Sequence, residues 1–183
     1  MIFRAVEDAD LIERTRKGDV ESYNLLVSRW EKRVYNYLLR ILGNRLACRE
    51  DALDLSQDVF LKAYQNIRKL EDPSRFGPWL FRIAHNEAYS LFRKRKPEDE
   101  LTGIEQTHEQ AYPVELRLAA SAALDKLSPE QREAVVLKIY QGFKFEEMAQ
   151  VLDCPVSTVK SRLYTALDLL KGTLAPIALR GVE

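Results

Sequence analysis

Apolar and polar residues alternate along most of this chain with the period of an α-helix. Apolar side chains recur three and four residues apart, which gathers them on one face of each helix. Only 7 Gly and 7 Pro interrupt the 183 residues, so the helical stretches are long. The pattern predicts helices at residues 8–17, 20–42, 49–67, 79–95, 114–127, 128–141, 145–152 and 155–170. A loop is predicted at 68–77 from the turn signals at residues 72–74 and at Gly77-Pro78. We therefore expect an all-α protein.

The last two of these helices, with the tight turn between them, form a candidate helix-turn-helix. The second helix turns one apolar face inward: Val159, Leu163, Ala166 and Leu170. Its opposite arc carries hydroxyls, one aromatic ring and charged groups: Ser157, Lys160, Ser161, Tyr164 and Asp168. A short helix with such a face is what helix-turn-helix proteins place in the major groove of DNA. Periodicity alone leaves an ordinary pair of structural helices as the alternative.

The helix at 79–95 has a second candidate face for nucleic acid. Its inward positions are apolar: Leu80, Ile83, Ala84, Ala88 and Leu91. The other side presents Arg82, Asn86, Tyr89 and Arg93. Cations that follow phosphates, beside an amide and a ring that engage unstacked bases, suit a single strand. The alternative is a solvated face on which the tyrosine is incidental.

The helix at 49–67 has an outward face of a different kind. Ala52, Leu55, Val59 and Ala63 form its inward stripe, and the outward positions are Asp54, Gln57, Asp58 and Leu61. An exposed leucine among acids and an amide favours a protein partner, because interfaces combine an apolar centre with a polar rim. A solvated face with one stray leucine is the alternative, since single exposed leucines are normal.

Several other residues receive structural or solvated roles from the pattern alone. The basic side of the helix at 20–42 is expected to face solvent: Arg29, Lys32, Arg33 and Arg40. His85 is expected to be a surface histidine. Cys48 and Cys154 are far apart in sequence and lack histidines at metal-ligand spacing, so we expect two buried thiols rather than a disulfide or a zinc site.

The distribution of charge divides the chain into two parts. The totals cancel, with 28 basic and 28 acidic residues, which is unusual for a protein that binds DNA by itself. A basic run at residues 93–96 is followed by six acids and no Lys or Arg at residues 97–115. Such a switch marks a boundary. We expect two small helical domains, at 1–96 and 114–183, joined by a flexible acidic linker at 97–113.

Composition restricts the classes of protein that remain. The chain has 46% apolar and 31% charged residues, as a globular protein does. No apolar run reaches the length that spans a bilayer, and the first residues are too acidic for a signal peptide. We expect a cytoplasmic protein.

Four segments resemble the sigma-70 family of RNA polymerase sigma factors, in its extracytoplasmic-function group. They are EDALDLSQDVF at 50–60, FGPWLFRIAHN at 76–86, LSPEQR at 127–132 and PVSTVKSRL at 155–163. In that family the first is similar to the polymerase-binding segment and the second to the segment that melts the minus-10 promoter element. The third resembles the opening of region 4, and the fourth resembles the part of the last domain that reads the minus-35 element. Both predicted domains are covered in the expected order.

The resemblance implies a role for named residues. Polymerase binding is implied for Asp51, Asp54, Gln57, Asp58, Phe60 and Leu61. Recognition and melting of the minus-10 element is implied for Phe76, Trp79, Arg82, Asn86, Tyr89 and Arg93. Recognition of the minus-35 element is implied for Ser157, Thr158, Lys160, Ser161, Arg162, Tyr164 and Thr165. The acids of the linker are implied to follow the basic path in polymerase that RNA later takes.

The resemblance also implies the partners and the kind of activity. Core RNA polymerase and promoter DNA are the expected partners, together with an anti-sigma factor, and the free chain is expected to be a monomer. We expect no catalytic residue, metal or cofactor, and a role in a stress or envelope response.

The chain departs from the family pattern at four positions. Ser90 stands where Asp is usual, which weakens one expected minus-10 contact. Lys144 replaces a Ser or Thr cap, so a weaker helix start is expected. Asp153 replaces the Gly of the turn, and it must adopt a left-handed conformation at some cost. Thr165 replaces a frequent Arg, which alters promoter preference.

Two rival functions were weighed against the sigma-factor interpretation. A stand-alone dimeric helix-turn-helix regulator would have a basic DNA-binding domain, whereas residues 144–171 carry four basic and four acidic groups. A helical metal-dependent hydrolase would need clustered histidines and carboxylates, and the chain has only His85 and His108.

Overall fold

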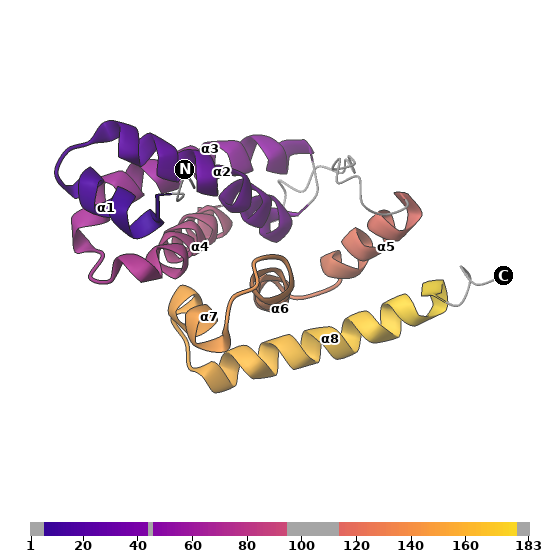
Figure 1. Cartoon of the computed structure of the whole chain (residues 1–183). Helices are drawn as coiled ribbons and strands as arrows, with labels where there is room; N and C mark the ends of the chain where they lie inside the picture. Colours follow the sequence, from indigo (N-terminus) through magenta and orange to yellow (C-terminus); the bar gives the residue numbers. More distant parts are fainter. Residues whose placement is uncertain (1–5, 44–45, 95–113, 179–183) are drawn as a thin grey trace, which may run out of the picture.

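The computed structural model describes residues 6–43, 46–94 and 114–178, and all regular structure in these ranges is helical (Figure 1). Two groups of helices, here called the first and second lobes, are formed by α1–α4 and by α5–α8. The predicted linker at 97–113 lies outside the described residues. No helix in the described ranges is both long and apolar enough to cross a membrane.

The first lobe consists of α1 (Asp8–Arg16), α2 (Val20–Leu42), α3 (Leu46–Asn66) and α4 (Phe76–Lys94). Asp19 caps α2 by accepting a hydrogen bond from the backbone amide of Ser22 at 3.2 Å, and Gly43 ends it with a φ of 101°. These local signals explain why α2 has the predicted bounds. Its inward residues Val34, Tyr37, Leu38 and Ile41 lie in the core of the lobe.

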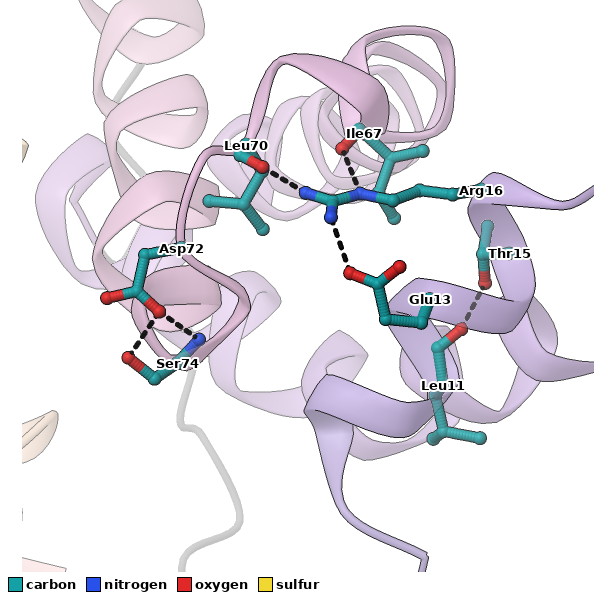
Figure 2. Close-up of polar contacts among 8 residues, drawn as sticks. All are labelled: Leu11, Glu13, Thr15, Arg16, Ile67, Leu70, Asp72 and Ser74. Atoms are coloured by element: carbon teal, nitrogen blue, oxygen red, sulfur yellow. Dashed lines mark hydrogen bonds and ion pairs between the residues drawn. The ribbon is translucent and has the colours of Figure 1, made fainter.

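The connection before α4 is more ordered than the sequence predicted. We expected a loop at 68–77, but two short 3-10 helices, η1 (Ile67–Lys69) and η2 (Pro73–Arg75), lead directly into α4 at Phe76. Figure 2 shows Asp72 accepting from the backbone amide of Ser74 at 2.9 Å, and Arg16 of α1 donating through Nε to the carbonyl of Ile67 at 3.3 Å. Arg16 also donates to the carbonyl of Leu70. Helix α1 therefore holds the connection that leads to α4.

The second lobe consists of α5 (Val114–Asp125), α6 (Pro129–Val135), the π-helix η4 (Val136–Tyr140), α7 (Phe145–Leu152) and α8 (Val156–Ala178). Ser128 starts α6 with a capping box, in which its hydroxyl accepts from the amide of Gln131 at 3.2 Å and its own amide donates to the Gln131 side chain at 3.1 Å. The single helix predicted at 128–141 changes to π geometry at Val136. Helix α8 extends eight residues beyond the predicted end at 170.

The two lobes pack against each other, which the sequence did not predict. Helix α4 contacts α7, and α2 contacts both α6 and η4. In Figure 1, α4 faces α7, and α6 lies between the first lobe and α8. The two lobes therefore share a boundary that brings the predicted minus-10 helix to the helix-turn-helix.

Candidate nucleic-acid interface

The outward face of α8 has the composition and exposure that the sequence predicted. Ser157, Lys160, Ser161, Tyr164 and Thr165 are exposed, while Val159, Leu163 and Ala166 are buried against the rest of the second lobe. Thr158 and Arg162 are half-buried at the edge of this face. The structure thus separates five exposed side chains from two at the margin.

The turn before α8 depends on a left-handed residue. Asp153 has φ 49° and ψ 45°, as expected for a residue that replaces glycine there, and it ends α7. Helix α7 lacks a side-chain cap from Lys144, but the Glu147 carboxylate accepts from the Lys144 backbone amide at 2.7 Å. This bond supplies one half of a capping box and partly compensates for the missing Ser or Thr.

Phe145 of α7 organises the exposed face of α8. The Lys160 ammonium lies 5.3 Å from the centre of its ring, and the Tyr164 ring centre lies 6.5 Å away. The ammonium of Lys138, on η4 of the same lobe, lies 4.8 Å from the centre of the same ring. A cation over an aromatic face is held by the ring quadrupole. Lys160 and Tyr164 are therefore presented together from one platform.

Arg162 differs from its neighbours on α8. Its Nη1 lies 3.9 Å from the sulfur of Cys154, and the side chain is half-buried. Cys154 is also only half-buried, so the prediction of a fully buried thiol was wrong for this residue, whereas Cys48 is buried. Burial raises the pKa of the Cys154 thiol, and the Arg162 charge opposes that rise. The Cys154 thiol is therefore held neutral beside the turn.

Helix α4 presents most of its predicted nucleic-acid face. Arg82, Asn86 and Arg93 are exposed, whereas Trp79 and Tyr89 are half-buried. Phe76 contradicts the prediction, because its side chain is only 2% exposed. Its ring packs between Trp30 at 5.7 Å and Trp79 at 5.9 Å. Phe76 belongs to the core of the first lobe in this structure and does not offer its ring to a base.

The sequence predicted that His85 is a surface histidine, and this prediction was wrong. Its Nδ1 lies 2.8 Å from Oε1 of Glu133, a residue of α6 in the other lobe. Glu133 is 1% exposed and also accepts a hydrogen bond from the hydroxyl of Tyr37 on α2. Glu133 could not be predicted from the sequence, because a carboxylate on a short helix carries no sign of burial until the lobes are placed together.

Two arginines that we expected in solvent contact the second lobe instead. Arg33 donates through Nη2 to the carbonyl of Gln141 at 3.0 Å, and its guanidinium lies 4.6 Å from the ring centre of Trp30. Burial lowers the Arg33 pKa, and the charge of Asp8 opposes this. The Arg40 guanidinium lies 4.2 Å from the ring centre of Tyr140. Both arginines therefore join the lobes.

The outward face of α3 matches the prediction except at one residue. Asp54, Gln57, Asp58 and Leu61 are exposed, and Asp51 is half-buried. Phe60 is buried at 8% exposure, and Tyr23 donates a hydrogen bond to its carbonyl, so Phe60 contributes to the core and not to the outer face. Leu53 and Tyr64 are also exposed on α3. Their spacing of eight and three residues from Leu61 could have identified them as neighbours on one helical stripe.

Known proteins are similar in sequence to this chain over nearly its full length. Residues 26–98 match the family model of sigma-70 region 2, and residues 117–170 match that of sigma-70 region 4. The ECF RNA polymerase sigma-E factor of Haemophilus influenzae is 30% identical over 93% of this chain and 96% of that protein. The RNA polymerase sigma-H factor of Pseudomonas aeruginosa is 28% identical over 93% of this chain and 95% of that protein.

Solved structures show the same arrangement of helices. The sigma factor RpoE of Bartonella quintana, in complex with the anti-sigma factor NepR, has a TM-score of 0.74 and 27% identity over 85% of this chain and 98% of that chain. CnrH, in complex with the cytosolic domain of CnrY, has a TM-score of 0.69 and 28% identity over 92% of this chain and 97% of that chain. With both regions matched in order, this chain belongs to the extracytoplasmic-function group of the sigma-70 family and is a sigma factor that directs transcription initiation.

Proposed function

We propose that this sigma factor uses three separate helical faces to recruit core RNA polymerase and to place it on promoters. The observation that carries the proposal is the pair of outward polar faces on α4 and α8, which lie on different lobes and have different chemistry. The proposed units are a polymerase- and minus-10-binding domain at 1–96, a linker at 97–113 and a minus-35-binding domain at 114–183.

The face of α8 reads the major groove of the minus-35 element. Lys160, Ser161 and Tyr164 are exposed together beside Phe145, within reach of base edges when the helix enters the groove. Ser157, Thr158 and Thr165 offer hydroxyls at both ends of the face. Arg162, at its edge, contacts a phosphate and fixes the position of the helix.

The face of α4 holds the melted non-template strand of the minus-10 element. Arg82 and Arg93 are both exposed and lie about three turns, or roughly 16 Å, apart along α4, so both can contact one strand that follows the helix. Asn86 and Tyr89 lie between them and offer an amide and a ring to unstacked bases. Trp79 supports the start of this face, and Phe76 is excluded from direct contact because of its burial.

The face of α3 binds polymerase. Leu61 is 57% exposed and has Leu53 and Tyr64 as exposed apolar neighbours on the helix, with Asp54, Gln57 and Asp58 as a polar rim. Buried apolar anchors surrounded by polar residues are typical of protein interfaces. An interface centred on Leu61 therefore explains why α3 exposes three large apolar side chains.

An anti-sigma factor is a further proposed partner of this chain. Related structures contain an anti-sigma factor, which supports such a partner for this chain. We further propose a cytoplasmic protein that is monomeric before it meets polymerase and that has no catalytic activity of its own.

Transcription by purified core polymerase on a library of genomic fragments tests the proposal. Addition of this protein is expected to produce start sites that share two sequence elements, and light scattering of the free chain is expected to give a monomer. A dimer that binds duplex DNA tightly without polymerase, and that produces no new start sites, would favour the helix-turn-helix regulator instead.

A further inference from the structure

The second lobe covers part of the face that we assign to the minus-10 strand. Arg82 Nη2 lies 3.2 Å from Oδ1 of Asp153, the left-handed residue in the turn of the helix-turn-helix. Tyr89, about two turns further along α4, is half-buried, and its pKa is raised by burial and then by the charge of Glu133. Two residues proposed to hold DNA therefore face carboxylates of the same chain.

The centre of this contact is a buried carboxylate shared by three helices. Glu133 of α6 lies 2.8 Å from His85 of α4 and accepts from Tyr37 of α2. Its second oxygen, Oε2, is buried and has no hydrogen-bond partner among the described residues. Tyr37 and His85 belong to the first lobe and Glu133 to the second. We call these three residues the Glu133 latch.

Apolar packing surrounds the latch. The rings of Phe81 on α4 and Phe143 before α7 meet edge to face with centres 5.1 Å apart. Within the first lobe, Gly77 allows the Trp30 ring to pack closely against the start of α4, because a Cβ at Gly77 would lie 2.8 Å from that ring, whereas it would lie at an ordinary contact distance of 3.7 Å from the Phe143 ring. At the edge of this boundary, Arg33 of the first lobe donates a hydrogen bond to the Gln141 carbonyl of the second lobe. The boundary between the lobes thus combines apolar packing with a buried polar centre.

The latch is specific but costly. A carboxylate taken out of water with one oxygen unpaired loses hydration that its two remaining partners only partly replace. When the lobes separate, Glu133 regains water, whereas Tyr37 and His85 lose their partner. Because the regained hydration of Glu133 and the lost hydrogen bonds of Tyr37 and His85 oppose each other, the contact has a defined geometry but a small net stability. A ligand that binds the open state can therefore separate the lobes.

We propose that the Glu133 latch holds the free chain closed, with Asp153 in the place of a DNA phosphate on Arg82, so that the minus-10 face is masked until the lobes separate. This inference rests on the proposed function of α4. The closed state lowers the apparent affinity for single-stranded DNA by the fraction of chains that are open. Masking would keep an unassembled sigma factor from engaging DNA.

Two conservative substitutions test the latch in the full chain. Tyr37→Phe removes the hydroxyl that reaches Glu133 and keeps the ring, which packs on Phe81 at 5.0 Å. Asp153→Asn removes the charge that faces Arg82 and keeps a residue that tolerates the left-handed turn. The matched control joins Tyr23→Phe and Asp125→Asn, whose bonds to the Phe60 carbonyl and to Arg132 stay within one lobe.

The first measurement is the radius of gyration from small-angle X-ray scattering, with circular dichroism to confirm helical content. The wild type and the control are expected to be compact, and the Tyr37→Phe/Asp153→Asn chain is expected to expand. A wild type that is already extended, or a double variant as compact as the control, would overturn the latch. If the double variant loses helical content, the two single variants decide.

The second measurement is the affinity for a fluorescein-labelled pool of short single-stranded DNA of random sequence. Loss of a hydrogen bond to a buried carboxylate is expected to move the closed-to-open ratio about tenfold, and the affinity should rise severalfold as the open fraction grows. Expansion without any gain in affinity would overturn masking. Scattering involves no DNA, so it tests closure of the two lobes independently of the proposed function of α4. Transcription by the holoenzyme with Asn86→Ala tests that function, because loss of promoter-dependent transcription is expected if α4 holds the minus-10 strand.

Discussion

Arg82 of α4 and Asp153 of the α7–α8 turn form an ion pair of 3.2 Å across the boundary between the two lobes. Both side chains are largely solvent-exposed, at 49% and 78%, so this pair by itself contributes little to stability. Its importance lies in position, because it joins the helix proposed for the minus-10 strand to the turn that orients the minus-35 helix. A phosphate can replace the Asp153 carboxylate on Arg82 at little net cost.

Substitutions on α8 are expected to separate base readers from phosphate anchors. Lys160→Ala and Ser161→Ala should change sequence preference in the minus-35 element, by about 1–3 kcal/mol wherever a base contact is lost. Arg162→Ala should weaken all sites alike, because Arg162 lies at the edge of the face against Cys154. Transcription from a library with a randomised minus-35 element measures both effects.

Lys171→Ala is a suitable control for Lys160→Ala, since it removes an exposed cation from the same helix outside the proposed set. Equal losses at every library sequence for Lys160→Ala, Ser161→Ala and Arg162→Ala would contradict the assignment of the readers.

Substitutions on α4 are expected to impair promoter opening more than initial binding. Asn86→Ala removes an exposed amide, and Tyr89→Ala removes a ring that lies 4.3 Å from His85. Both should slow the formation of open complexes on duplex DNA. A template with a preformed bubble should restore much of the activity, because the unstacking cost has already been met. An equal defect on both templates would rule out a role in melting.

A charge in the centre of the α3 face is expected to abolish polymerase binding without unfolding the chain. Leu61 is 57% exposed, so Leu61→Asp should change thermal stability little while it places a charge in an interface core. Leu25→Asp is the matched control, because Leu25 is 51% exposed on α2 outside the proposed face. Comparison of melting temperature and polymerase affinity for both variants checks the prediction. Unchanged polymerase affinity for Leu61→Asp would show that this face of α3 is an ordinary solvated surface and does not bind polymerase.

The elements that depend on local chemistry could be predicted from the sequence. The bounds of α2 follow from its Asp19 cap and from Gly43, and the end of α7 follows from the left-handed Asp153. The inward stripe of α8 follows from helical periodicity. The family resemblance, which the matched regions confirmed, rests on such local segments. Fold class and the outward faces were therefore accessible without a structure.

What the sequence could not provide is the contact between the lobes. His85, Arg33 and Glu133 have polar side chains, and their burial depends on which helices meet across 48 to 108 residues of sequence. The early start of α4 was missed for a local reason, because Gly77 and Pro78 were interpreted as loop signals. Proline is tolerated in the first turn of a helix, where the amides lack partners in any case.

Tyr37 is expected to couple stability to pH in the alkaline range. Its pKa is raised well above the ordinary value of 10.0, first by complete burial and then by the charge of Glu133. The folded state therefore holds this proton more tightly than the unfolded state. The resulting stabilisation is fully present below the unfolded pKa near 10 and is lost as the pH rises through the folded pKa.

The free energy of unfolding, measured by urea denaturation at increasing pH, tests this coupling. Above about pH 10, the wild type should lose up to about 1.4 kcal/mol per pH unit from this one group, a slope that Tyr37→Phe should lack. Tyr23 and Tyr89 also have raised pKa values because of burial, so both chains should retain some alkaline dependence. The difference between the two curves isolates Tyr37. Parallel curves would show that the Tyr37 hydroxyl is not buried beside Glu133 in solution, because a phenol in water would ionise alike in both states.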